Sequence, residues 1–70
     1  MQTITLRDEF IKLGQALKAA GLVDSGVEAK IVIINGEVKV NSETETRRGR
    51  KLFDGDIVSY NGNEIKISKN

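Results

Sequence analysis

The dipeptide Asn61–Gly62, which lies between two strand-like runs, is the feature that most constrains how this chain can fold. Both residue types tolerate the positive φ angles of a type I′ turn, so the pair is a strong short-range signal for a β-hairpin. The flanking runs are residues 57–60 and 64–68, and in the second run Ile65 and Ile67 fall on one face of a strand. The C-terminal part of the chain is therefore predicted to form a hairpin with one face turned to a core.

Residues 7–20 have the spacing of an amphipathic helix. The apolar positions recur at intervals of three and four residues: Phe10, Leu13, Leu17 and Ala20. Asp8 and Glu9 come in the first turn, where carboxylates interact favourably with the helix dipole, and Gly21 suits a C-terminal cap. Gly14 costs on the order of 1 kcal/mol of helix stability relative to alanine. The pattern still predicts a helix from Arg7 to Ala20.

The segment that follows has two competing interpretations. Ser25 and Glu28 have the spacing of a capping box, which predicts a helix that runs to about Ile34. The alternative is a strand, because residues 31–34 are all β-branched and Asn35–Gly36 is a favoured hairpin turn. Periodicity does not separate these two possibilities in so short a segment. We favour the helix because the cap and the small residues near it support that interpretation.

The remaining segments complete an α+β pattern. Thr3–Leu6 alternates polar and apolar residues as a short strand does, and Val38–Val40 does the same. Residues 41–51 are polar and basic, which predicts a flexible loop with no apolar anchor, and Asp54–Asp56 predicts a tight turn. The expected fold is a single domain, residues 1–70, with a short N-terminal strand, two helices and a small twisted antiparallel sheet.

The residue inventory excludes several kinds of functional site. The 70 residues include neither cysteine nor histidine, which removes disulfides, Cys/His zinc sites, thiol nucleophiles and histidine bases. The carboxylates of residues 54–56 are too few for a hard cation, which takes about six oxygen ligands. We expect no enzyme activity, no cofactor and no metal. No apolar run reaches the roughly 18 residues of a membrane span, so a cytoplasmic location is expected.

Four cations crowd into five positions of a chain whose net charge is only +1. They are Arg47, Arg48, Arg50 and Lys51. Guanidinium groups bind phosphate through paired, charge-assisted hydrogen bonds, so the cluster predicts a surface for a nucleic-acid backbone. The alternative is a solvated loop in which these cations pair with Glu43 and Glu45.

Aromatic side chains are few. The rings belong to Phe10, Phe53 and Tyr60. Their positions in the pattern predict that they lie in the core, which disfavours binding through rings that stack on bases. Folded or double-helical RNA, recognised by its shape and phosphates, fits better. Lys12, Lys18 and Lys30 would add to such a surface only if folding brings them to the same face as the basic loop.

The order of segments and several short motifs resemble a known family. The motifs are Phe-Ile-Lys-Leu-Gly-Gln-Ala-Leu-Lys-Ala-Ala-Gly from position 10, Ile-Asn-Gly-Glu-Val-Lys-Val-Asn from position 34 and Arg-Arg-Gly-Arg-Lys-Leu from position 47. Over residues 10–60 they resemble the αL RNA-binding domain first named for ribosomal protein S-four, especially its small stand-alone bacterial members. The resemblance implies two packed helices followed by a β-hairpin region, with RNA held across the helices and the adjoining loop. It also supports the helical interpretation of residues 31–34.

Matched position by position, the resemblance implies RNA contacts from every part of this motif. The matching residues are Lys12 at the start of the first helix motif, Ser25 and Lys30 in the second, Lys39 and Asn41 in the strand and turn that end it, and Arg47, Arg48, Arg50 and Lys51 in the basic loop. The chain departs from the family pattern at Gly26, where arginine is common, and this removes one expected phosphate contact. Gly14 stands where aspartate is common, and Ser42 stands where glycine usually follows Asn41.

Together these observations predict a monomeric, non-catalytic module that docks on structured RNA, with ribosomal RNA as the expected class. The alternative is a small adaptor that binds an acidic protein surface through the same cations.

Overall fold

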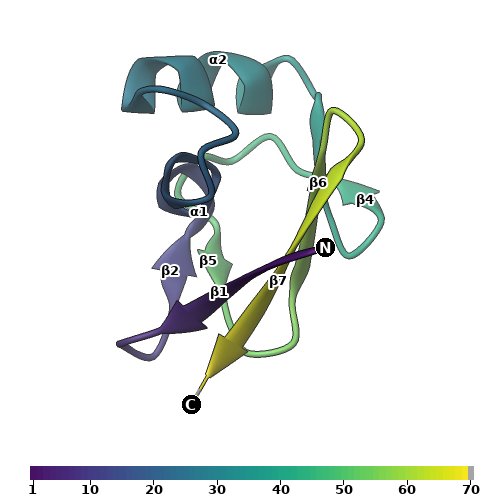
Figure 1. The fold of residues 1–70 in the computed structure, drawn as a ribbon. Coiled ribbons are helices and arrows are strands. Elements are labelled where there is room, and N and C mark those ends of the chain that lie inside the picture. The colour runs from purple at the N-terminus through teal and green to yellow at the C-terminus, as the bar shows by residue number, and fades with distance from the viewer. Residues whose placement is uncertain (70) are drawn as a thin grey trace.

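The computed structural model describes residues 1–69 as a five-stranded sheet, a two-stranded ribbon and two short helices (Figure 1). Along the chain the elements are β1 (Gln2–Leu6), β2 (Ile11–Lys12), α1 (Leu13–Ala19), α2 (Gly26–Ile34), β3 (Val38–Val40), β4 (Glu43–Thr44), β5 (Lys51–Leu52), β6 (Ile57–Tyr60) and β7 (Asn63–Lys69). Asn70, the last residue of the predicted domain 1–70, lies outside the described residues.

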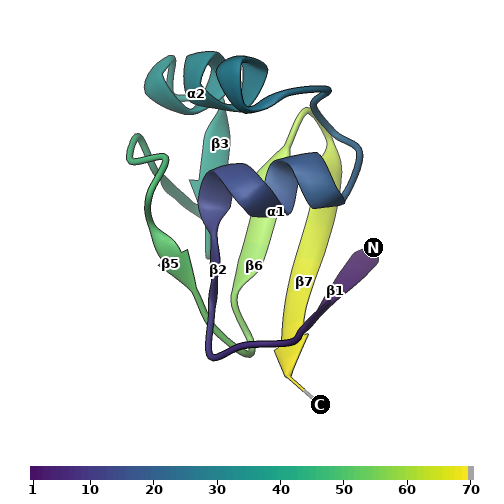
Figure 2. The same cartoon turned by 90° about the vertical axis from the view of Figure 1, so that its left-hand side faces the viewer.

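The five-stranded sheet has the order β1-β7-β6-β3-β4. β1 runs parallel to β7, with Ile4 opposite Ile67, whereas the other neighbours in this sheet are antiparallel. The predicted antiparallel sheet is formed by β7, β6, β3 and β4, and the predicted N-terminal strand adds a parallel pair at its edge. A parallel pair needs a crossover connection between its strands. Both helices belong to the chain that connects β1 to β7, and Figure 2 shows α1 lying in front of β6 and β7.

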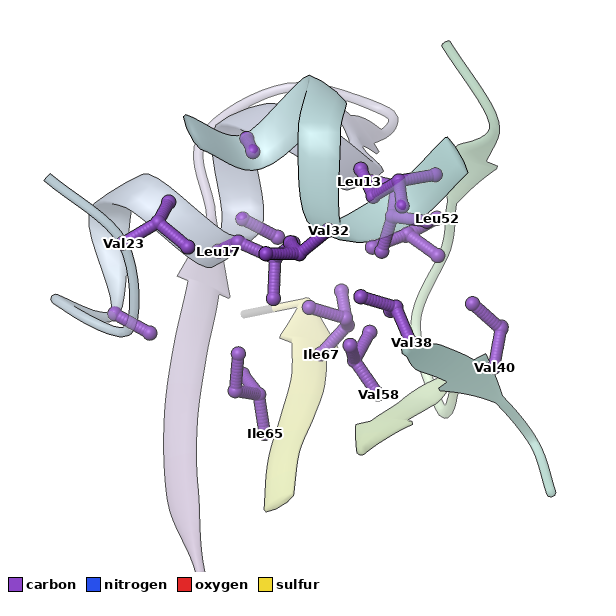
Figure 3. Close-up of a cluster of buried hydrophobic side chains, with 14 of the residues drawn as sticks. Leu13, Leu17, Val23, Val32, Val38, Val40, Leu52, Val58, Ile65 and Ile67 are labelled. Atoms are coloured by element: carbon purple, nitrogen blue, oxygen red, sulfur yellow. The ribbon is translucent and has the colours of Figure 1, made fainter. Parts of the chain in front are cut away.

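The core lies between the helices and one face of the sheet (Figure 3). Its largest fully buried side chains come from both layers: Leu13, Leu17, Ile33, Leu52, Ile65, Ile67, Val38, Val40 and Val58. In β7 the buried Ile65 and Ile67 alternate with the exposed Glu64 and Lys66. The predicted inward face of this strand is confirmed.

The predicted hairpin turn at Asn61–Gly62 is also confirmed. Asn61 has a φ of 51° and Gly62 a φ of 80°, both in the left-handed region that a type I′ turn requires. Tyr60 pairs with Asn63 directly across the turn. The two-residue connection thus sets the register of β6 against β7.

The helical interpretation of residues 31–34 is confirmed, and the strand alternative is wrong. Ser25 precedes α2, and its Oγ accepts a hydrogen bond of 3.1 Å from the backbone N–H of Glu28. The Glu28 carboxylate accepts from the N–H of Asp24 at 2.8 Å, one residue earlier than in a regular capping box. A side-chain cap at this position satisfies an amide that has no partner inside the helix.

The first helix is shorter than the sequence predicts. Residues 7–9 form bends, Ile11–Lys12 forms β2, and α1 begins only at Leu13. Asp8 and Glu9 therefore precede the helix and do not occupy its first turn. The β-branched Ile11 pairs instead with Leu52 of β5, so pairing between distant segments overrides the helical spacing of these residues.

Contact with the basic loop determines where α1 begins. The backbone N–H of Leu13 donates to the carbonyl of Arg50 at 2.8 Å, and that of Gly14 donates to the carbonyl of Arg48 at 3.2 Å. The first amides of a helix have no partner within it. The loop carbonyls supply these partners and hold residues 48–50 against the helix.

Gly14 permits this close approach. A Cβ atom added at position 14 would lie 2.9 Å from Cγ of Arg48, a distance that forces one of the two to move. The glycine that weakens the helix in the sequence pattern thus makes room for the basic loop.

Replacing Gly14 with alanine should displace the loop from α1. We expect the amide protons of residues 13 and 14 to exchange about fivefold faster, as for the loss of a hydrogen bond worth about 1 kcal/mol. Amide hydrogen exchange followed by NMR measures this change. The control is Gly49→Ala, because a Cβ at that position meets no atom within 4 Å. Equal exchange rates in the two variants would contradict the proposed role of Gly14.

Candidate nucleic-acid interface

A shallow hollow of about 350 Å³ opens between the starts of α1 and α2 and the basic loop. Its lining residues are Lys12, Gly14, Gln15, Lys18, Gly26, Arg48 and Gly49. Three of them are cations and none is a carboxylate. Folding therefore brings Lys12 and Arg48, which are far apart in the sequence, to one surface. We call this site the basic hollow.

Another hollow, of about 380 Å³, lies between β1 and α1. Its lining is largely apolar and includes Arg7 together with Asp8. Because these two charges are opposite, this hollow does not present the one-signed potential that attracts a polyanion. The basic hollow is the better candidate for binding nucleic acid.

Each cation of the basic hollow is positioned by a different element. Lys12 ends β2 and is the N-cap residue of α1, where its backbone N–H donates to Oε1 of Gln15 at 3.2 Å. Lys18 lies in the last turn of α1. The backbone of Arg48 is held by the hydrogen bond that its carbonyl accepts from the N–H of Gly14. The hollow is thus built from a strand end, a helix and a loop that pack together.

Gly26 leaves the hollow open on the α2 side. A Cβ atom at this position would meet no atom within 4 Å. Gly26 therefore contributes no side chain to the lining of the hollow. Lys30 lies four residues further along α2, which places it on the same side of the helix, one turn from Gly26.

A buried carboxylate anchors the basic loop. Glu45 is only 6% exposed, and its carboxylate accepts hydrogen bonds from Arg47 Nε at 3.0 Å and from Arg50 Nη1 at 2.8 Å. The same carboxylate accepts from the backbone N–H groups of Thr46 and Arg47. The predicted loop thus has a polar anchor in place of an apolar one. The prediction of a loop over residues 41–51 is wrong where Glu43–Thr44 forms β4 and Lys51 begins β5.

Hydrogen bonds from Arg47, and next from Arg50, lower the pKa of the Glu45 carboxyl from 4.5 to about 2, although burial opposes this shift. The same contact raises the pKa of the Arg47 guanidinium. Pairing of the loop cations with acids, which was the alternative to phosphate binding, thus applies to Arg47 and Arg50. It involves Glu45 and not Glu43 in the described residues.

The other cations of this region remain available to a ligand. Across residues 1–69, Lys12, Lys18, Lys30, Arg48 and Lys51 form no ion pair. The basic loop therefore divides into two kinds of residue. Arg47 and Arg50 organise the loop around Glu45, whereas Arg48 and Lys51 present unpaired charge.

Of the nine predicted site residues, Lys12 and Arg48 line the basic hollow and the other seven do not. Besides the loop residues and Lys30 described above, three of these seven are placed elsewhere in the fold. Lys39 is exposed between the buried Val38 and Val40, so it projects from the sheet face that points away from the helices. The exposed side chain of Asn41 makes hydrogen bonds within the chain: Nδ2 donates to Asp56 at 3.0 Å, and Oδ1 accepts from the backbone N–H of Ile57 at 2.9 Å. The third, Ser25, caps α2.

Lys18 belongs to the basic hollow, although it is not among the residues that the family resemblance implies in RNA contacts. The sequence did contain a signal, since Lys12, Gln15 and Lys18 recur at intervals of three residues on one side of the predicted helix. The sequence pattern did not show that residues 48–50 dock on α1. This docking decides that Arg48 is the loop cation that lies near Lys12 and Lys18.

Comparisons with known proteins agree with this geometry. The family model of the S4 domain matches residues 4–68. RlbA of Bacillus subtilis (strain 168), named as a ribosome maturation protein, is 48% identical over 59 residues, which cover 84% of this chain and 83% of RlbA. YbcJ of Escherichia coli (strain K12), named for RNA binding, is 37% identical over 68 residues, which cover 96% of this chain and 97% of YbcJ.

The solution structure of YbcJ from E. coli is similar in fold. It superposes with a TM-score of 0.74 at 36% identity and covers 97% of this chain and 87% of that one. That structure is described as having an αL motif involved in RNA binding. The small α+β architecture expected from the sequence, with the αL motif, is thus confirmed.

Replacing Glu45 with glutamine should destabilise the domain at neutral pH by about 1–3 kcal/mol, because two charge-assisted hydrogen bonds lose their carboxylate. A carboxyl whose pKa is lowered by folding contributes stability above its ordinary pKa of 4.5, and this contribution is lost as the pH falls toward 2. The difference between wild type and variant should therefore shrink across that interval. Urea unfolding at several pH values measures it.

Glu43→Gln is the matched control, because Glu43 lies nearby in β4, is exposed and forms no ion pair in the described part of the chain. This variant should be as stable as the wild type at every pH. The interpretation of Glu45 fails if the two variants lose equal stability, or if the Glu45→Gln effect persists near pH 2.

Proposed function

Because this chain belongs to the S4 domain family, we propose that it is a non-catalytic RNA-binding protein that docks on structured RNA. The αL motif of the structurally similar YbcJ is described as involved in RNA binding, and the same architecture carries the basic hollow here. The resemblance to RlbA, named as a ribosome maturation protein, supports ribosomal RNA as the target and the cytoplasm as the location.

The observation that carries the proposal is the gathering of Lys12, Lys18 and Arg48 around one hollow without a carboxylate. Like charges held close together repel one another, and a polyanion that binds between them removes this repulsion. RNA adds the release of counterions from its backbone, which favours binding most strongly at low salt. A nearly neutral chain with cations on one face thus binds in a preferred orientation.

The hollow suits phosphates and riboses better than base edges. It is open to solvent, and its charged groups belong to the exposed residues Lys12, Lys18 and Arg48. RNA helices are recognised mainly by shape and through contacts to phosphates and 2′-hydroxyls. We infer that the cations of the hollow bind successive phosphates along the backbone of a folded RNA. These cations are Lys12, Lys18 and Arg48, with Lys30 and Lys51 at the margins.

Replacing Arg48 with alanine should weaken binding to a short RNA hairpin and lower the dependence of affinity on salt. With about four to six phosphates contacted, the slope of log affinity against log salt should be near −3 to −5, and it should change by about one unit in the variant. Arg47→Ala should have a smaller effect on this slope, because Glu45 already neutralises part of that charge. Fluorescence anisotropy at several salt concentrations measures both variants.

Lys66→Ala is the control, since Lys66 is exposed on the sheet face away from the helices. Its affinity and slope should equal those of the wild type. If Arg48→Ala behaves like Lys66→Ala, the hollow is not the interface. If polyglutamate competes as well as RNA at equal charge, the adaptor for an acidic protein surface is the better interpretation.

A further inference from the structure

The ribbon formed by β2 and β5 carries two aromatic and two cationic side chains on its outer face. Lys12 lies directly opposite Lys51, and Ile11 lies opposite Leu52. Leu52 is fully buried, so the inward face of the ribbon belongs to the core. Phe10 directly precedes β2 and Phe53 directly follows β5, and continuing the alternation by one residue places both rings on the side of the two lysines. The contact of Lys51 with the Phe10 ring agrees with this placement. We call these four residues the ribbon platform.

The rings of the platform are in contact and partly open to solvent. The centroids of Phe10 and Phe53 lie 6.0 Å apart with an interplanar angle of 51°. Nζ of Lys51 lies 4.8 Å from the centroid of Phe10, within the range of a cation–π interaction. Phe53 remains 45% exposed. The prediction that the aromatic rings lie in the core is therefore wrong for Phe53, and Phe10 is only half-buried.

Hydrogen bonds hold the backbone of Phe53 in place. Its N–H donates to Oδ2 of Asp56 at 2.7 Å, and its carbonyl accepts from the N–H of Asp56 at 3.0 Å. The other carboxylate oxygen of Asp56 accepts from Asn41. The family resemblance implied that Asn41 contacts RNA. Through Asp56, Asn41 instead helps to position the backbone of Phe53, whose ring is exposed. Because the backbone that carries the ring is already held, a ligand that stacks on Phe53 has to order only its side-chain torsions.

The two lysines of the platform are placed unfavourably without a ligand. Like charges directly opposite each other in an antiparallel pair destabilise it. Neither Lys12 nor Lys51 forms an ion pair in the part of the chain that the structure describes. An anion between them would remove the repulsion. Lys12 also lines the basic hollow, so the platform and the proposed interface share this residue.

We propose that the ribbon platform binds one unpaired nucleotide of the RNA, with its base stacked on Phe53 and its phosphate between Lys12 and Lys51. This inference rests on the proposed RNA-binding function and adds to it the kind of RNA that is preferred. Every base has a π face, so stacking on an exposed ring beside backbone-binding cations selects an unstacked nucleotide without selecting its identity. The target is then a helix interrupted by a bulge or a loop.

A pair of RNA hairpins tests this preference directly. Both have the same helix and loop, but one carries a single bulged adenosine in the helix. The wild type should bind the bulged hairpin about tenfold more tightly than the paired one, since stacking of one base contributes about 1–3 kcal/mol. Phe53→Leu should abolish the preference while leaving the salt slope unchanged. The control Ile34→Ala removes an exposed apolar side chain of α2 and should keep the preference.

A second variant reports on stacking without relying on affinity. The chain contains no tryptophan, so Phe53→Trp introduces a single indole at the platform. Its emission should be quenched by the bulged hairpin and much less by the paired one, because a base must stack on the indole. Thermal unfolding of both Phe53 variants confirms that they fold.

The outcomes separate this inference from the proposed function. Equal binding of the two hairpins by the wild type, or a preference that survives in Phe53→Leu, overturns the platform and leaves phosphate binding intact. Indole emission that responds equally to the two hairpins overturns it as well. Absence of salt-dependent binding to either hairpin overturns the proposed function, and the platform falls with it.

Discussion

Two backbone hydrogen bonds, from the amides of Leu13 and Gly14 to the carbonyls of Arg50 and Arg48, hold the cationic surface of this domain together. These two bonds lie where strand β2 ends and helix α1 begins, and they dock the basic loop on the helix. Because the loop carbonyls occupy these amides, recognition of an anion at this place is left to side chains. The lack of a Cβ at Gly14 is the steric condition for the contact, which explains a glycine near the start of a short helix.

Acidic residues in this chain organise the basic surface more than they oppose it. Glu45 pairs with Arg47 and Arg50 and ties down the loop from the inside, which leaves Arg48 to the basic hollow. Asp56 holds the backbone of Phe53 on one side and the side chain of Asn41 on the other. A net charge of +1 is therefore compatible with a hollow that is lined by three cations and no carboxylate, since carboxylates such as those of Glu45 and Asp56 are bound within the fold.

Local signals predicted those elements whose conformation depends on neighbouring residues alone. The Asn61–Gly62 turn, the cap of α2 at Ser25 and the alternation of Ile65 and Ile67 are of this kind. The start of α1 could not be predicted in this way, because Ile11 satisfies both a helical spacing and a strand pair, and its partner Leu52 lies far along the chain. The parallel pairing of β1 with β7 could not be predicted either, because the two strands lie at opposite ends of the sequence.

For the candidate site, the sequence by itself determined which charges exist, that four of them are crowded together and that cysteine and histidine chemistry is absent. Only the tertiary structure decided which of those charges are free, because the pairing of Glu45 with two arginines depends on how the loop closes on itself. It also decided that Phe53 is exposed and that Lys39 faces away from the helices. Spacing along a chain specifies a face of one element, whereas exposure and ion pairing depend on what packs against that face.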